Sequence, residues 1–278
     1  MIKDITIFEI NMGVKGISKI VKKFGKKYSN LEFMKGKRIA IDASIFLYRF
    51  KYNTVTTQAF IQKFHAQIKL FIDNEITPIY VFDGVPPEIK QVTLDSREKT
   101  RNQAVLIADL EKDPEKVEKI MKNVIRITKE DKLNLKEFFD MNGVKYICPE
   151  ATEGEKFCAY LDKTNQVDFV LSNDYDSIAF GCTNLVFTNN DSTYTLYNTQ
   201  TILSELNGGI SQEDYIKMCI ASGCDYYPQG IKNFGPSKSL AAIKKRVPFE
   251  NWPGNDIPKE TVETMMKIFL EDPQEVID

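Results

Sequence analysis

The sequence predicts an α/β protein whose mostly parallel central sheet is flanked by helices. Short apolar runs typical of buried strands recur along the chain, at residues 38–42, 78–82, 144–148 and 169–171. Segments with helical spacing separate them, such as residues 58–74, in which every third or fourth residue is a large apolar one. Strands that alternate with helices favour a parallel sheet that is covered on both faces.

The first helices are predicted from spacing and from capping residues. Apolar residues recur at helical spacing over residues 17–24, and we expect Gly25 with Lys26 and Lys27 to close that helix. Another helix begins at about Ser44, directly after the first strand.

Later helices and a hairpin are predicted from spacing and capping residues in the same way. Thr128 and Asp131 form a capping-box-like start for a helix that an Asn-Gly pair ends. Residues 185–197 are typical of a hairpin, and residues 212–220 of a helix. Pro236 is placed to start a basic helix that runs to about residue 246.

Residues 85–126 differ in character from the rest of the chain. They are heavily charged, and prolines stand at one end and in the middle. Scattered valine, leucine and isoleucine residues still give the segment something to bury. We therefore expect two long, weakly amphipathic helices that form a protruding insertion.

The composition excludes several classes of protein. The chain has 278 residues, of which 42% are hydrophobic and 27% charged, as is ordinary for a globular protein. No apolar run approaches the roughly 20 residues that cross a bilayer, so we expect no membrane association. The five cysteines are an odd number and lack Cys-x-x-Cys spacing. This disfavours a disulfide framework or a zinc site and favours an intracellular, reducing compartment.

The charge distribution is more informative than the net charge of −2. Between residues 15 and 38 there are nine lysines and arginines and one acid, Glu32. A second basic group occupies residues 244–246. Each group could be a solvated face. However, acids gathered in one site would leave an overall acidic protein with basic patches for nucleic acid.

Acidic side chains follow the carboxyl ends of the predicted strands. They are Asp42, Asp83, Glu153, Glu155, Asp174 and Asp176. Because ligands of open α/β sheets bind at this edge, we expect these acids to converge there. Singly, each could be a turn residue or a helix cap. Together they would destabilise the fold, since two carboxylates about 5 Å apart repel by roughly 3 kcal/mol at an effective dielectric of 20.

Divalent cations would remove this repulsion. Carboxylate oxygens select hard cations such as Mg²⁺ or Mn²⁺, and the lone His65 is expected to be structural or at the surface. Two such ions are the usual apparatus for in-line displacement at phosphorus. The sequence therefore indicates a metal-dependent phosphodiesterase chemistry.

Basic residues supply candidate contacts to a nucleic acid. Lys90, Arg97 and Arg101 are spaced so that on a helix they lie within about 40° of one another. Such a stripe could hold a scissile phosphate, although it could also be a solvated helix face. The loop at residues 233–236 precedes a helix and is a natural phosphate seat. Tyr48 could stack on a base.

These motifs resemble the flap endonuclease/XPG family of structure-specific 5′ nucleases. The resemblance runs from Met12 to about Ile277 and rests on MGVKGISKIV (12–21), AIDAS (40–44), YVFDGVPPEIK (80–90), EGE (153–155), SNDYDSIAFG (172–181) and SGCDYYPQGIKNFGPSKS (222–239). It implies a PIN-like nuclease core with a helical arch at about residues 85–126 and a helix–two-turn–helix element. We expect one compact domain with four regions: an N-terminal extension (1–11), an N-terminal nuclease region (12–130), an internal nuclease region (131–222), and the helix–two-turn–helix with C-terminal helices (223–278).

The resemblance also implies roles for individual residues. The metal ligands, for two Mg²⁺ ions that Mn²⁺ can replace, would be Asp42, Asp83, Glu153, Glu155, Asp174, Asp176 and Asp225. Catalysis would involve Lys90, Arg97 and Asp174. Contacts to DNA would come from Tyr48, Arg101, Lys232, Gly235, Ser237 and Lys238, with a K⁺ ion at the helix–two-turn–helix.

By the same resemblance the substrate is DNA with a 5′ flap, nick, gap or recessed end, cut one nucleotide into the duplex during replication and repair. The protein is expected to act as a monomer, in the nucleus or wherever DNA is replicated. The first candidate function is thus a flap endonuclease and 5′→3′ exonuclease.

The chain departs from the family pattern in four places. Eleven residues precede Met12, so either this extension threads aside from the active site or Met12 is the true start. Asn233 replaces the usual hairpin glycine, and asparagine tolerates a positive φ. The chain stops at Asp278 without a clamp-binding peptide, so the resemblance does not carry sliding-clamp recruitment over. No long spacer separates the two halves, which disfavours XPG itself.

Other functions stay open at this point. SGCDYY and AFGC favour a predominantly exonucleolytic relative, whereas PPEIK and the compact insertion favour flap cutting. A DNA-structure-binding protein without turnover would keep the binding surfaces alone. A Mg²⁺ phosphatase would need a second aspartate where this chain has Ser44.

Overall fold

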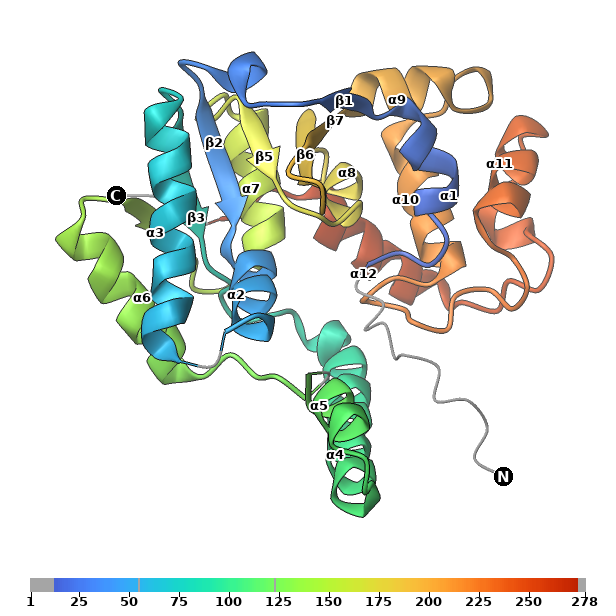
Figure 1. Cartoon of the computed structure of the whole chain (residues 1–278). Coiled ribbons are helices and arrows are strands. Elements are labelled where there is room, and N and C mark those ends of the chain that lie inside the picture. Colours follow the sequence, from blue (N-terminus) through green and yellow to red (C-terminus); the bar gives the residue numbers. More distant parts are fainter. Residues whose placement is uncertain (1–12, 55, 123, 275–278) are drawn as a thin grey trace.

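The protein has a central sheet, described here from a computed structural model that covers residues 13–54, 56–122 and 124–274. Within these residues seven strands form one sheet in the order β1-β7-β6-β5-β2-β3-β4 (Figure 1). Strands β2 to β6 run parallel to their neighbours, whereas β7 and β1 are added antiparallel at one edge. The sequence prediction of a mostly parallel α/β fold is confirmed.

The strands have the following bounds: β1 Lys26–Tyr28, β2 Arg38–Asp42, β3 Thr77–Val81, β4 Lys145–Ile147, β5 Phe169–Leu171, β6 Asn184–Thr188 and β7 Tyr194–Asn198. All four predicted strands and the hairpin are present, with ends shifted by at most one residue. The register pairs Asp42 at the end of β2 with Val81 at the end of β3. Their carboxyl ends therefore lie at the same edge of the sheet.

The α-helices surround this sheet. Their bounds are α1 Ser18–Val21, α2 Ala43–Tyr52, α3 Thr57–Asp73, α4 Gln91–Leu110, α5 Pro114–Lys122, α6 Lys129–Met141, α7 Gly154–Lys163, α8 Asp176–Ala179, α9 Thr199–Glu205, α10 Gln212–Ser222, α11 Pro236–Lys244 and α12 Lys259–Leu270. Short 3₁₀ turns are η1 Lys22–Phe24, η2 Glu32–Met34, η3 Glu88–Lys90, η4 Leu206–Gly208 and η5 Phe249–Asn251. No helix in the described part of the chain has the length and apolar character that a bilayer span needs.

Alternation along the strands divides the core into two layers. Ile39 and Ile41 of β2 pack with α2, α3 and α6, whereas Ala40 between them packs on the side of α7, α8 and α10. The predicted apolar face of α3, including Phe60 and Phe64, is buried in the first layer. Helices thus cover both faces of the sheet, as the sequence pattern indicates.

Helices α4 and α5 form the predicted insertion. They pack against each other and project from the body of the molecule, below the carboxyl ends of the strands in Figure 1. Pro114 begins α5, which has only 9 residues against 20 in α4. The expectation of two long helices is therefore correct only for the first.

One local prediction is wrong, and two others concern residues that the structure does not describe. Lys26 and Lys27 do not close a helix but pair with β7 as the edge strand β1. Their side chains are exposed, and lysines are common on an edge strand because they discourage further pairing. The expected extension at residues 1–11 and Met12 lie outside the described residues.

Candidate active site

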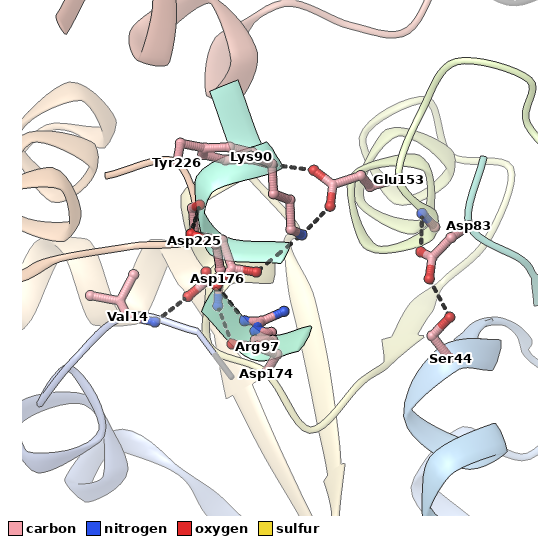
Figure 2. A network of polar contacts seen from close by, with 12 residues as sticks. Val14, Ser44, Asp83, Lys90, Arg97, Glu153, Asp174, Asp176, Asp225 and Tyr226 are labelled. Atoms are coloured by element: carbon pink, nitrogen blue, oxygen red, sulfur yellow. Dashed lines mark hydrogen bonds and ion pairs between the residues drawn. The ribbon is translucent and has the colours of Figure 1, made fainter. Parts of the chain in front are cut away.

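Seven carboxylates gather at the carboxyl edge of the sheet, and we call them the acidic cluster. They are Asp42, Asp83, Glu153, Glu155, Asp174, Asp176 and Asp225. The first six follow strands β2, β3, β4 and β5, as predicted, and Asp225 follows helix α10. Figure 2 shows most of them with their polar partners.

Asp42 and Asp83 both accept hydrogen bonds from Ser44, one from its backbone and one from its side chain. Asp42 ends β2 and caps α2, where its Oδ1 accepts from the backbone N–H of Ser44 at 3.0 Å. The hydroxyl of Ser44 donates to Oδ2 of Asp83 (Figure 2). Asp83 in turn accepts from the backbone N–H of Gly154, at 2.8 Å, and so docks the start of α7 against the end of β3. Backbone donors and two serine hydroxyls fix these carboxylates, since the hydroxyl of Ser172 donates to Oδ2 of Asp42 at 3.4 Å.

Helix α7 contributes the two glutamates. Glu153 is the N-cap of α7 and accepts from the Tyr226 hydroxyl at 2.6 Å. Glu155, in the first turn, accepts from the Ser177 hydroxyl of α8 at 2.8 Å. Negative side chains here also complement the positive end of the helix dipole.

Asp174 and Asp176 stand beside the first described residues of the chain. The backbone N–H of Val14 donates to Oδ1 of Asp176 at 2.9 Å, and Asp176 N–H donates to Asp174 at 3.0 Å. Gly13 has a φ of +82°, and a Cβ there would lie 2.3 Å from Oδ1 of Asp174. Only glycine allows the chain to approach this carboxylate so closely.

Two basic side chains from the insertion compensate the acids. Lys90 Nζ forms an ion pair with Glu153 and another with Asp225, at 3.0 Å, and Arg97 donates to Asp225 at 2.6 Å (Figure 2). The side chains of Lys90 and Arg97 are only 15% and 20% exposed. Burial would lower the pKa of Lys90, but Glu153 and Asp225 outweigh it and raise that pKa above its ordinary value.

Arg101 does not join this group. Its nearest ionic partner is Glu98 on its own helix, at 3.7 Å. The helical stripe expected from sequence is therefore broken at both ends, because Lys90 belongs to η3 and precedes α4.

Burial and mutual repulsion raise the pKa values of several acids in the cluster. Burial, followed by the charge of Asp83, raises the pKa of Asp42 to about 8. Burial and neighbouring carboxylates put the pKa values of Glu155 and Asp176 well above their ordinary range, and burial raises the pKa of Asp174. Opposite charge at this edge would stabilise the ionised forms.

The donor set fits hard divalent cations, because all seven side chains offer carboxylate oxygen. Among the described residues, no three or more Asp, Glu, His or Cys side chains are already arranged so that they could hold a metal ion. Instead, serine, tyrosine, lysine and arginine side chains form hydrogen bonds and ion pairs with the carboxylates. Cation binding would therefore require these side chains to rearrange.

The predicted DNA contacts lie on three other elements. Tyr48 is half-buried on α2. Gly235 is the N-cap of α11, where Ser237 and Lys238 are exposed, and Lys238 Nζ donates to the carbonyl of Asn233 at 2.6 Å. Lys232 is also exposed. Asn233 has a φ of 59°, so the turn forms with asparagine as expected.

Sequence reasoning missed several partners of the acids. Ser44, Ser177 and Tyr226 hold Asp83, Glu155 and Glu153. Each of the three lies within two residues of an acid of the cluster, so proximity in sequence was an available signal. The contact from Val14 had no such signal, because it depends on a separation of 162 residues.

Comparison with known proteins identifies the family of this chain. Two family domains match the chain by sequence, the XPG N-terminal domain at residues 12–104 and the XPG I-region at residues 143–225. Among solved structures, the flap endonuclease-1 from Methanococcus jannaschii superimposes with a TM-score of 0.67 and 28% identity, over 90% of this chain and 83% of that one. The catalytic core of Rad2 in complex with DNA substrate gives a TM-score of 0.67 and 25% identity, over 92% and 77%.

The fold and the acidic cluster define a PIN-like nuclease core. A flap endonuclease 1 from Entamoeba histolytica is 34% identical over 86% of this chain and 69% of its own length. One from Nematostella vectensis is 29% identical over 95% and 78%. The chain belongs to the flap endonuclease/XPG family of structure-specific 5′ nucleases, metal-dependent enzymes of DNA replication and repair.

Proposed function

We propose that this protein cleaves DNA phosphodiester bonds at 5′ flaps, nicks, gaps and recessed ends, with two Mg²⁺ ions that Mn²⁺ can replace. The acidic cluster carries this proposal, because its seven carboxylates share one edge and are compensated there by Lys90 and Arg97 of the insertion. When bound, the divalent ions would supply activation of water and neutralisation of charge at phosphorus. The whole acidic cluster would hold them.

Lys90 and Arg97 are the groups of this chain that would act on the scissile phosphate. Both are largely withdrawn from water, so their attraction for an anion is less screened than at a free surface. Both lie at the foot of the helical arch, where α4 begins. A phosphate at this edge would compete with Glu153 and Asp225 for the positive side chains of Lys90 and Arg97. Their role is positioning and charge stabilisation.

The duplex would be held away from the cut site. The loop before α11 places the backbone N–H groups of Gly235 and Ser237 at the start of a helix, which suits a phosphate, whereas the N–H of Lys238 donates to the carbonyl of Gly235 at 3.0 Å. The lysine ammonium groups of Lys232 and Lys238 add attraction for the backbone. Tyr48 would stack near the scissile nucleotide, and Arg101 would contact the strand that reaches the arch. A K⁺ ion would complete the helix–two-turn–helix.

We infer that the enzyme works as a monomer in a reducing, intracellular compartment, in the nucleus or wherever DNA is replicated. The five cysteines, Cys148, Cys158, Cys182, Cys219 and Cys224, are all free, which suits a reducing compartment. The insertion is compact, and this favours cutting of flaps, with 5′→3′ exonuclease activity as the second action of the same site.

A matched pair of aspartate variants tests the site. Asp174→Asn removes a charge at the carboxyl end of β5, whereas Asp168→Asn removes one just before its amino end, where Asp168 accepts from Arg38 N–H at 2.9 Å. Flap, nick, gap and blunt substrates labelled at either end are incubated with Mg²⁺, Mn²⁺ or EDTA. We expect Asp174→Asn to bind flap DNA but not to cut it, and Asp168→Asn to cut normally.

Three results would contradict the proposal. Cleavage by Asp174→Asn at the wild-type rate would remove the acidic cluster from the reaction. Cleavage in EDTA would remove the metal requirement. Binding of flap DNA by the wild-type protein without any product in Mg²⁺ or Mn²⁺ would instead favour a DNA-structure-binding protein.

A further inference from the structure

The hydroxyl of Tyr215 is buried without a hydrogen-bond partner among the described residues. The side chain lies in helix α10 and has 0% exposure to solvent. A buried polar group without a partner costs about 1–3 kcal/mol, and such groups are rare in folded proteins. A phenylalanine would fill the same space without that cost. The oxygen atom therefore calls for a physical reason.

Helix α10 packs against α8 beside the acidic cluster. One turn earlier, the Gln212 side chain donates to the carbonyls of Ile178 and Ala179, at 2.7 and 2.8 Å. These contacts fasten the start of α10 to the end of α8, the short helix that Asp176 begins. Residues three apart share a helix face, so Tyr215 faces α8 as well.

The pKa of Tyr215 is consistent with a position near Asp174 and Asp176. Burial, then the neighbouring Cys219, Asp176 and Asp174, raise the pKa of Tyr215 well above its ordinary value. Both acids are close enough to act on the phenol. Asp176 is itself buried, with 5% exposure, and its Oδ1 accepts from Val14. It begins a helix of only four residues, so few contacts fix its carboxylate.

We propose that Tyr215 is a positioning residue whose hydroxyl donates to the carboxylate of Asp176 when the acidic cluster holds divalent cations. The inference rests on the proposed function, since it assumes that Asp176 is a metal ligand. An ionised carboxylate is the strongest acceptor that a phenol can find in a buried site. Hydrogen bonds of this kind orient metal ligands, and their loss typically weakens metal affinity by about 10–100-fold.

Tyr215→Phe removes only the oxygen and tests this directly. We expect the unfolding midpoint of the metal-free protein in EDTA to be unchanged or higher, because the variant loses an unpaired polar group. Affinity for Mn²⁺, titrated by electron paramagnetic resonance without DNA, should weaken by about tenfold. The stabilisation by Mn²⁺ in thermal unfolding should shrink accordingly.

Tyr80→Phe is the matched control. Tyr80 is equally buried, but its hydroxyl donates to Gln67 at 2.8 Å on the other layer of the core. This variant should unfold at a lower temperature to the same extent with and without Mn²⁺, and it should keep the wild-type Mn²⁺ affinity. The two tyrosines thus predict opposite patterns for the same chemical change.

Two outcomes would overturn the role of Tyr215. One is unchanged Mn²⁺ affinity in Tyr215→Phe. The other is an equal loss of stability in EDTA and in Mn²⁺, as expected for Tyr80→Phe, which would make the hydroxyl merely structural. Failure of the proposed function is distinguishable, because the wild-type protein would then bind no Mn²⁺ or Asp174→Asn would bind it normally.

Discussion

The ammonium group of Lys51 lies 2.5 Å from the carboxylate of Asp131 and joins the last turn of α2 to the first turn of α6. Asp131 is buried, and it also completes the capping box of α6 with Thr128. Helix α2 carries Asp42 at its start, and α6 is the first helix after the insertion. This ion pair therefore connects the acidic cluster's scaffold to the base of the arch.

Lys51→Met should lower the free energy of unfolding by about 1–3 kcal/mol. The substitution leaves a buried charge without its partner, and the value is below that of a fully buried pair because Lys51 is 28% exposed. Urea unfolding at neutral pH measures it. Lys63→Met, at an exposed lysine of α3, is the control and should stay within about 0.5 kcal/mol of wild type. A loss equal to the control's would show that the pair contributes nothing.

Asp131 should also contribute to the loss of folding stability at low pH. Burial alone would raise its pKa, but hydrogen bonds from Lys51 and Thr128 hold the pKa below its ordinary value of 3.8. The unfolded chain then binds more protons than the folded one near this pH, so stability is lost as pH falls below about 4. Asp131→Asn should show a shallower decline there than wild type. Asp109→Asn, at an exposed acid, should show the wild-type decline.

Gly13→Ala should impair cleavage far more than stability. The added methyl group would lie 2.3 Å from Oδ1 of Asp174 and must displace it. A displacement of about 1 Å at a reacting centre can cost roughly a hundredfold in rate. Gly36→Ala is an exact backbone control, since Gly36 has a similar φ of +72° and nothing within 4 Å of the new methyl group. Equal cleavage rates in the two variants would contradict the close approach.

Lys90→Met should destabilise the metal-free protein by about 3 kcal/mol, because Glu153 and Asp225 lose their shared cation. Mg²⁺ should reduce this loss by supplying charge at the same edge. Cleavage should fall in parallel, and Lys90→Arg should recover part of it. Urea unfolding in EDTA and in Mg²⁺ gives the comparison, with the exposed Lys99→Met as control. An equal loss in both conditions would mean that Lys90 does not neutralise the acidic cluster.

Much of this arrangement could be predicted from the sequence, because it depends on local patterns. Apolar runs followed by Asp42, Asp83 or Asp174 mark strand ends, and strand ends of a parallel sheet meet at one edge. The apolar run of Ile39, Ala40 and Ile41 likewise marks a strand that is covered on both faces, as the two core layers show. Such signals need no knowledge of the tertiary fold.

Long-range contacts could not be predicted in this way. Lys26 and Lys27 have no strand signal of their own, and they become β1 because β7 offers an unpaired edge. The bond from Val14 to Asp176 and the orphaned hydroxyl of Tyr215 depend on how distant helices pack. Periodicity also treated Lys90 to Arg101 as one helix, whereas the chain has a 3₁₀ turn up to Lys90, and Arg101 instead contacts Glu98.

Lys238→Glu should weaken duplex binding and flatten its dependence on salt. Lys238 is exposed at the start of α11, and in the structure its ammonium group hydrogen-bonds only to the carbonyl of Asn233 among the described residues. Each phosphate contact contributes about −0.9 to the slope of log K against log salt concentration, so loss of one contact should reduce the slope by about one. Lys145→Glu makes the same charge change at an exposed residue of the far edge strand β4 and should leave the slope unchanged. Fluorescence anisotropy with a labelled duplex between 50 and 200 mM salt, about the range over which such contacts are resolved, measures both variants. If both variants shift the slope equally, the duplex does not lie on the loop before α11, and non-specific attraction explains the binding.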